Sequence, residues 1–150
     1  MPATGDRPKD PFRGFKFKVV IDGIQRAGFR EASGLYAAND SIDYREGDDK
    51  SVTIRKLPGL KKFSNITLKR GITDDMDLWK WRKQIMDGKI QDSRKSGQII
   101  LMDDEGNDVA EWDFVGAWPT KWTGPTFNAT ANEVAIDTLE ITHEGLDRVK

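Results

Sequence analysis

Few residues of this chain have side chains suited to catalysis. The sequence contains one histidine, His143, and no cysteine. It therefore offers little for a nucleophilic triad and nothing for a multi-histidine or thiolate metal site. Its glycines punctuate turns and do not form a phosphate-binding loop of the Walker or dinucleotide type. We expect no catalytic residue and no cofactor.

The densest group of carboxylates lies in residues 103–108. In a calcium-binding loop, however, Gly106 would stand at the wrong position, and Phe114 would occupy the place of the closing glutamate. A solvated hairpin turn explains the same residue types without an ion. We favour the turn over the ion site and expect no bound metal.

Five tryptophans form another group with a possible binding role, because indole faces can stack on the apolar faces of sugars. Buried aromatic side chains also dominate the energetics of cores and interfaces. We favour packing in a core or interface over a sugar-binding surface. The five residues are Trp79, Trp81, Trp112, Trp118 and Trp122.

Size and charge exclude further classes. The 150 residues suit a single domain, which we place at residues 1–150 with residues 1–11 as a flexible N-terminal arm. The 24 basic and 25 acidic residues give a net charge of -1, so no global field attracts nucleic acid or an anionic membrane. No apolar run approaches the roughly 18–20 residues that span a bilayer. The first residues lack the apolar core of a signal peptide, so we expect assembly in the cytoplasm.

Alternation of apolar and polar residues predicts most of the strands. The clearest runs from Phe15 to Ile21, and the Asp22-Gly23 pair after it is typical of a hairpin turn leading to a second strand from Gln25. The turn-rich residues 103–107 predict a second hairpin. The other predicted strands lie near residues 42–44, 66–69, 98–102, 109–115 and 134–142, with a connection over 119–132 and a polar linker over 89–96.

Residues 74–87 are predicted to form an amphipathic helix. Thr73 before two aspartates is typical of an N-cap, and Gly88 is typical of a C-terminal cap. The residues expected to pack are Leu78, Trp79, Trp81, Ile85 and Met86, which recur at helical spacing. The helix must then cover a sheet face, which predicts a mainly β fold, an antiparallel sandwich or small barrel with one packed helix.

Residues 46–60 fit neither a strand nor a tight turn. The segment is too long and too polar for a hairpin turn in a domain of this size. A floppy loop is one interpretation, and a functional loop is the other. The candidate functional residues are Glu46, Gly47, Asp48, Asp49, Lys50, Arg55, Lys56, Leu57, Pro58 and Gly59.

Taken together, these segments resemble the tail-tube proteins of contractile phages, R-type tailocins and extracellular contractile injection systems. The order and spacing of the motifs are hard to reach by chance, and the resemblance covers residues 10–149. The motifs are FKFKV with Asp22-Gly23, FRE with SGL, and YREG, followed by RKLPGL at 55–60, ITLKRGIT at 66–73, GAWPTK at 116–121, NEVAI at 132–136 and HEGL at 143–146.

The resemblance implies a fold similar to that of the type VI secretion tube subunit and a structural, non-enzymatic role. Six copies would form a ring, and rings would stack into a hollow tube that carries cargo and is driven through the target envelope by sheath contraction. The implied partners are further copies of the chain, a sheath, a baseplate with its spike, and a tube terminator. The tube would be part of a phage tail or a released particle.

A tube would explain the polar strand faces and the long segment 46–60. Asp43, Arg45, Thr67 and Lys69 alternate with apolar residues, so we expect them to face the water-filled lumen, although a one-residue slip would exchange the faces. The functional residues within 46–60 carry both signs of charge, which suits a contact between the unlike faces of successive rings.

Two other functions compete with the main tube subunit. A tube-initiating baseplate adaptor of the same family would share its fold and motifs, and copy number in purified particles separates the two. A soluble carbohydrate-binding β domain would bind glycan as a monomer, whereas a tube protein forms rings.

Overall fold

The computed structural model describes residues 10–14, 16–24, 28–45, 47, 54–130 and 132–150. Most of the expected N-terminal arm lies outside these residues. The elements are β1 (Phe17–Ile21), β2 (Glu31–Ser33), β3 (Ala37–Tyr44), β4 (Arg55–Phe63), β5 (Ile66–Gly71), α1 (Asp77–Met86), α2 (Ile90–Ser93), β6 (Lys95–Met102), β7 (Asp108–Thr123), β8 (Ile136–Thr142) and β9 (Gly145–Arg148). The described part of the chain is thus mainly antiparallel β, as expected.

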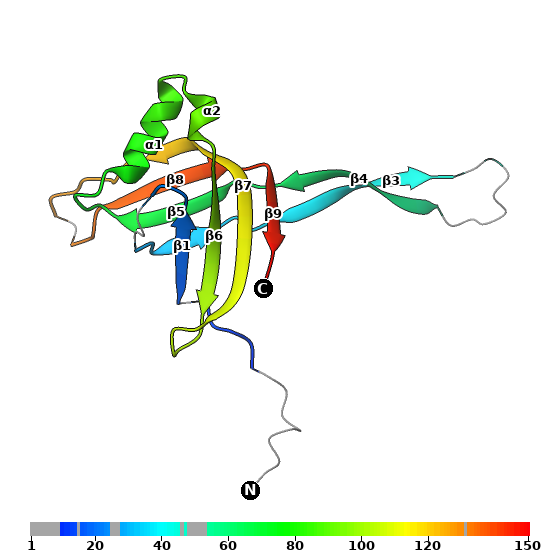
Figure 1. The fold of residues 1–150 in the computed structure, drawn as a ribbon, viewed down its shortest axis with the longest axis horizontal. Helices are drawn as coiled ribbons and strands as arrows, with labels where there is room; N and C mark the ends of the chain where they lie inside the picture. The colour runs from blue at the N-terminus through cyan, green and yellow to red at the C-terminus, as the bar shows by residue number, and fades with distance from the viewer. Residues whose placement is uncertain (1–9, 15, 25–27, 46, 48–53, 131) are drawn as a thin grey trace, which may run out of the picture.

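Strand β7 belongs to two sheets. Its first half pairs with β6 on one side and β9 on the other, while its second half pairs with β8. Register shifts interrupt its ladders on both sides, as is common where a strand bends. The sheet therefore runs in the order β1-β6-β7-β8-β5-β2 and folds over on itself (Figure 1). This arrangement confirms the prediction of an antiparallel sandwich or small barrel.

The second half of β7 was predicted to be an irregular connection. Pro119 favoured that interpretation, because proline is rare inside sheets. In the structure Pro119 is buried and pairs with Ile141 of β8. The last β7 residue paired with β6 is Ala117, so β7 has become an edge strand where the proline occurs. An edge position tolerates the missing N–H.

Strand β1 is confirmed, but its predicted hairpin partner is wrong. Asp22-Gly23 does form a turn, and Gln25 lies outside the described residues. The strand that pairs with β1 is β6, in a register that places Phe17 opposite Leu101. Helix α2, in the expected polar linker, and strand β9 had not been predicted.

The core lies between the two halves of the folded sheet. Its buried side chains alternate along each strand, as they do in β5. Helix α1 packs at one end of this core, near the second half of β7 (Figure 1). The buried cluster is Val19, Ile21, Ile66, Leu68, Leu78, Trp81, Ile99, Phe114, Ala117, Leu139 and Ile141.

Helix α1 is confirmed but is shorter than predicted. It begins at Asp77, whose N–H donates to Asp75 Oδ1 at 2.9 Å, and Gly88 follows it with a φ of +84°. Leu78 and Trp81 are buried, and Trp79 and Ile85 are half-buried. The expected packing of Met86 is wrong, because this last helical residue is 60% exposed.

The last part of the segment predicted as a long loop, residues 55–60, belongs to the second strand of a hairpin. Strand β4 pairs with β3 from Tyr44 opposite Arg55 to Ala37 opposite Phe63. The two strands leave the body of the protein together and form a long arm (Figure 1). Below, "the arm" means β3 and β4. The loop prediction failed because the strands show no alternation between buried and exposed residues.

Several polar contacts join the arm to the body. Ser64, directly after β4, donates its hydroxyl to the carbonyl of Gly34 at 2.8 Å, and its own carbonyl lies 3.0 Å from Nε2 of His143. Asn65 Nδ2 donates to Glu140 Oε1 at 2.9 Å. The histidine ring also contacts Phe63, with ring centroids 5.6 Å apart. His143 thus has a structural environment at the root of the arm.

Replacing Trp81 by alanine tests the packing of α1. The side chain is 2% exposed, and its indole N–H donates to the Ser93 carbonyl at 2.6 Å. Large-to-small changes of this kind cost about 3–5 kcal/mol. We expect Trp81→Ala to lower the melting temperature strongly in a thermal unfolding experiment. Met86→Ala is the matched control and should change the stability by less than about 0.5 kcal/mol; equal melts would refute the packing.

Replacing Gly34 by alanine tests the root of the arm. Gly34 has a φ of +96°, and an added Cβ would collide with the carbonyl oxygen of Asn65. The left-handed conformation alone costs a non-glycine residue about 1–2 kcal/mol. We expect Gly34→Ala to destabilise the protein by more than this amount in denaturant unfolding. Gly47→Ala, which adds a Cβ in open space, should leave the unfolding curve in place.

Candidate assembly surfaces

The arm has one apolar and one charged face. Residues paired across an antiparallel ladder share a face, so Ile42 and Leu57 lie together, with Tyr44 beside them. Ile42 is 50% exposed and Leu57 is 42% exposed. The predicted alternation along residues 42–45 therefore exists, but the apolar face has no cover within the described part of the chain.

The opposite face of the arm carries an ion pair between the two strands, and a second ion pair lies on the same face as Ile42, closer to the body. Lys56 pairs with Asp43, and Lys62 Nζ lies 2.8 Å from Asp40 Oδ1. Both pairs are exposed, so each contributes little to stability. Lys56 lies opposite Asp43 in the register of β3 and β4, so this pair marks the face that carries neither Ile42 nor Leu57.

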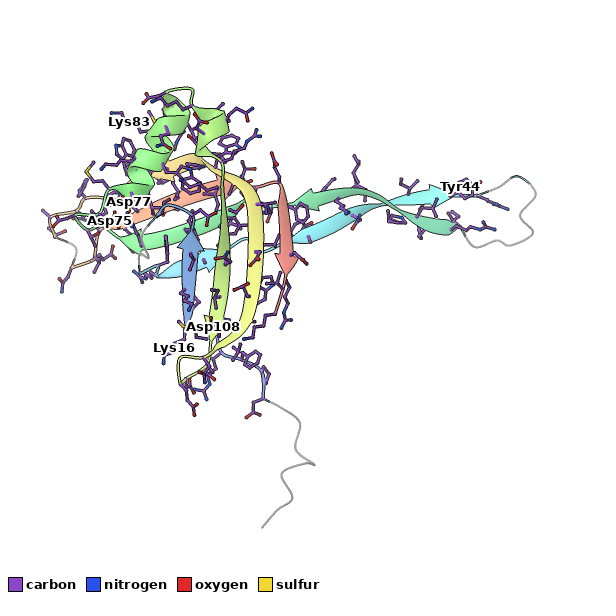
Figure 2. All side chains as sticks on the ribbon, viewed as in Figure 1. Lys16, Tyr44, Asp75, Asp77, Lys83 and Asp108 are labelled. Carbon is purple, nitrogen blue, oxygen red and sulfur yellow. The ribbon has the colours of Figure 1, made fainter. Side chains whose placement is uncertain are left out.

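The structure places the predicted ring-contact residues unevenly. Arg55 to Gly59 lie in β4, on the arm, where they form part of a regular ladder. Gly47 is exposed. Glu46 and residues 48–50 lie outside the described residues. The predicted contact residues that can be placed therefore lie on the element that extends farthest from the body (Figure 2).

The four predicted lumen residues fall on two surfaces. Asp43 lies on the charged face of the arm, and Arg45 directly follows β3. Thr67 and Lys69 lie on β5, where they alternate with the buried Ile66, Leu68 and Arg70. The lumen assignment thus concerns two separate places and stays a prediction.

The outer face of the second sheet is polar throughout its centre. Thr67 and Lys69 face away from the core, and so do the residues opposite them on the neighbouring strands. Lys69 also pairs with Glu31 at 3.6 Å. The polar residues of this face are Glu31, Ser33, Thr67, Lys69, Thr138, Glu140, Lys121 and Thr123. Of these residues, the alternation in the sequence had predicted only Thr67 and Lys69, which lie on β5.

The acidic residues 103–108 form a hairpin turn between β6 and β7. Asp103 Oδ1 accepts hydrogen bonds from the backbone N–H of Asn107 at 2.8 Å and of Glu105 at 3.0 Å. These bonds, with that of Asn107 the strongest cause, hold the pKa of Asp103 below its ordinary value. The favoured interpretation as a turn agrees with this geometry. Among the described residues, no three His, Asp or Glu side chains are grouped to hold a metal ion.

The tryptophans pack against other side chains. Trp81 is buried, and Trp79 meets Trp122 edge-on with ring centroids 4.9 Å apart. Arg148 lies over the Trp112 ring at 5.5 Å. This arrangement favours the packing role over a flat platform for sugar.

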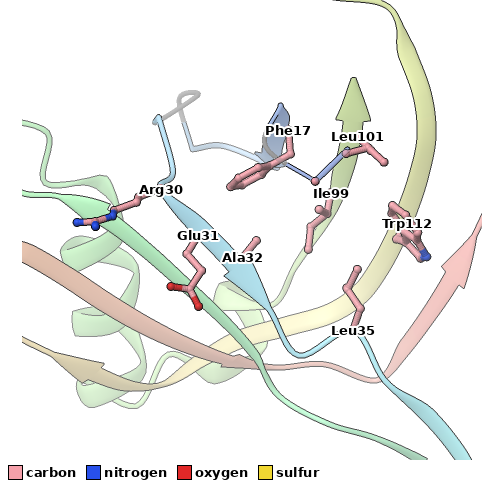
Figure 3. Close-up of a pocket in the computed structure, with 9 residues that line it drawn as sticks. Phe17, Arg30, Glu31, Ala32, Leu35, Ile99, Leu101 and Trp112 are labelled. Atoms are coloured by element: carbon pink, nitrogen blue, oxygen red, sulfur yellow. The ribbon is translucent and has the colours of Figure 1, made fainter. Parts of the chain in front are cut away.

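A cavity of about 320 Å³, missed by the sequence analysis, opens between the two ends of the folded sheet. Phe17 of β1 and Ala32 of β2 line it from opposite sides, and Ile99, Leu101 and Trp112 complete its apolar wall (Figure 3). No histidine lines it, and its charged lining residues are Arg30 and Glu31. The cavity marks the gap that keeps the barrel from closing.

In the described parts of the chain, no helix is long and apolar enough to cross a membrane.

Solved structures with this fold come from contractile injection systems. The chain is 28% identical to a chain of the anti-feeding prophage cap, described as the tube-terminating cap, with 99% and 98% of the two chains covered and a TM-score of 0.79. It is 26% identical to a chain of the PVC sheath-tube complex, an extracellular contractile injection system in its extended state, with 92% and 90% covered and a TM-score of 0.76.

The expected likeness to type VI secretion proteins is confirmed at the level of the fold. A structure described as a type six secretion system protein gives a TM-score of 0.53 at 8% identity, with 89% of this chain and 83% of the other covered.

The family match extends over almost the whole chain. None of the curated protein sequences matches it. Residues 13–147, however, match the family described as T4-like virus tail tube protein gp19. This match includes both sheets, the helix and the arm. The chain therefore belongs to the T4-like tail tube protein family.

Proposed function

We propose that the chain is the structural subunit of the inner tube of a contractile, phage-tail-like injection system. Residues 1–150 form one tube-forming domain, six copies make a ring, and rings stack into a hollow tube. The observation that carries this proposal is the arm, whose apolar face lies uncovered in the single chain. A two-stranded hairpin is at best marginally stable by itself. A neighbouring copy is the cover that a self-assembling protein provides.

The free ends of the sheet support ring closure through neighbouring copies. Within the described residues, β1 and β2 each pair on one side only, and they end the strand order. Unpaired edges of this kind are satisfied when another chain adds a strand. A single chain of this size encloses only a small space, so a wide channel needs several copies side by side.

The polar outer face of the second sheet is the lumen wall in this proposal. Thr67 and Lys69 are its central residues, and their neighbours on β2 and β8 are also polar. A sheet with one face on the core and one face in water has this alternation. Asp43 lies on the arm and Arg45 directly follows β3. These two residues face the lumen if the arm lies against the wall of the channel.

The partners follow from the position of a tube in a particle. A sheath surrounds it, a baseplate with a spike lies at one end, a terminator lies at the other, and effector cargo occupies the lumen. The subunit itself has no enzymatic activity, cofactor or specific nucleic-acid target. It assembles in the cytoplasm and leaves the cell as part of the particle.

Shortening the arm tests its role in stacking rings. Replacing residues 40–60 by Asn-Gly would connect Asn39 to Lys61, which already face each other across the ladder, by a two-residue turn. We expect a folded protein that forms rings but no long tubes, because only the projecting element is lost. Circular dichroism checks the fold, and negative-stain electron microscopy counts rings and tubes. Long tubes from the shortened chain would refute the role.

A point substitution on each face of the arm refines this test. Ile42→Asp charges the apolar face, whereas Ser41→Asp introduces the same carboxylate on the charged face. We expect Ile42→Asp to reduce tube length severely and Ser41→Asp to have little effect. Equal tube lengths would show that the apolar face is not buried in the tube.

Cysteine labelling tests the lumen assignment, since the chain has no cysteine of its own. In assembled tubes, Thr67→Cys and Lys69→Cys should react with a small maleimide that enters from the open ends. They should resist a maleimide attached to a large polymer. Lys80→Cys, on the exposed side of α1, is the control for an outer position. Equal labelling of Thr67→Cys by both reagents would place β5 on the outer wall.

A further inference from the structure

The end of the body opposite the arm carries an unexplained surface. It is formed by residues 72–77, before and at the start of α1, and by residues 124–130 and 132–137, between β7 and β8. Figure 2 shows Asp75 and Asp77 at this end and Tyr44 near the far end of the arm. These segments are called the acidic pole below. No core or lumen role has been assigned to them.

The acidic pole exposes large apolar side chains around a hollow. Phe127 is 85% exposed and Val134 is 72% exposed. Both line a hollow of about 250 Å³, together with Thr126 and Glu133. Exposed apolar groups that gather around a depression are typical of an interaction site.

The charge of the acidic pole has a single sign. Its segments contain no lysine or arginine, and the charged residues are Asp74, Asp75, Asp77, Glu133 and Asp137. Arg70 lies behind them and is nearly fully buried. Its guanidinium is 3.7 Å from Asp75, and Asp137 lies opposite it in the ladder of β5 and β8. The exposed carboxylates of the pole are therefore Asp74 and Glu133. A partner for this surface must combine exposed apolar side chains with positive charge.

The arm of the same chain has both properties. Its apolar face presents Ile42 and Leu57. Residues 37–45 and 54–63, which hold both strands of the arm, contain five basic residues, Arg45, Arg55, Lys56, Lys61 and Lys62, against two acidic residues, Asp40 and Asp43. Residues 46–53, between the two strands, carry three carboxylates and one lysine. The excess of positive charge is therefore confined to the strands.

We propose that the acidic pole of one copy is the receptor for the arm of the next copy. The apolar face of the arm covers Phe127 and Val134, while Arg55, which lies on the same face as Leu57, lies against the exposed carboxylates of the pole. The inference rests on the proposed role of the arm in stacking rings and adds the surface that the arm contacts. Because the two surfaces differ and lie at opposite ends, the contact is head-to-tail and repeats from copy to copy.

Chemical crosslinking tests this contact directly. In assembled protein, Leu57→Cys on the arm and Thr126→Cys at the hollow, combined in one chain, should be joined by a short bis-maleimide. Each copy then links to the next, so a denaturing gel should show a ladder of multimers. The ends are too far apart to be joined within one copy (Figure 2). The control combines Leu57→Cys with Lys80→Cys on α1 and should remain monomeric on the gel.

Charge reversal provides an independent readout of the same contact. Asp74→Lys with Glu133→Lys should leave folded rings but abolish long tubes, because like charges then meet. Adding Arg55→Glu, on the same face as Leu57, should restore tube formation in part. Lys80→Glu with Lys83→Glu, a change of similar size on α1, should leave tube formation intact. Circular dichroism and thermal melts of every variant show which ones are folded.

The outcomes separate this inference from the proposed function. Tubes without a Leu57–Thr126 ladder, or an equal ladder from the control pair, would overturn the acidic pole as receptor. If shortening the arm abolishes tubes while the ladder is absent, stacking by the arm stands and another surface receives it. If tubes form without the arm, both ideas fail. Normal tubes from the pole reversal, with binding of a sheath protein lost instead, would assign the pole to the sheath.

Discussion

The architecture depends on the membership of β7 in two sheets. Its first half pairs with β6 and its second half with β8, so the sheet folds over and buries one apolar face against itself. The same fold leaves β1 and β2 as ends that approach each other without pairing, with the apolar cavity between them. A fully closed barrel would have no edge to offer. Incomplete closure therefore leaves the edge strands with which neighbours would pair in the proposed ring.

The arm shows the same principle outside the core. Its strands pair in a long ladder, but neither strand alternates between buried and exposed residues. Side chains such as Ile42 and Leu57 gain nothing from the hydrophobic effect until another surface removes them from water. In the proposed tube, binding of a neighbour would therefore raise the stability of the arm by mass action. The hydrogen bonds of Ser64 and Asn65 fix where the arm starts from the body.

The sequence predicted the elements whose residue pattern follows from burial against one core or from a tight turn. The alternation in β1 and β5, the turn at 103–107 and the apolar stripe of α1 all reflect burial against one core. Pairing over long distances could not be predicted: β1 pairs with β6, although Asp22-Gly23 favoured a local hairpin. The strand character of residues 55–60 gave no signal, because both faces of that hairpin are exposed in the single chain. The acidic pole was missed for a related reason, since its residues lie in irregular segments without periodicity.

Three surfaces of the subunit have different roles in the proposed assembly. In the proposed tube, edge strands close the ring, a polar sheet face meets water, and the arm with its receptor joins successive rings. A contact between opposite ends of one molecule cannot be satisfied by a closed pair, because each bound copy presents a new free arm and a new free pole. Such a contact has no intrinsic end. The chain therefore encodes the diameter of the tube through the angle between neighbours in the ring, whereas its length must be set by components that cover the last free arm or pole.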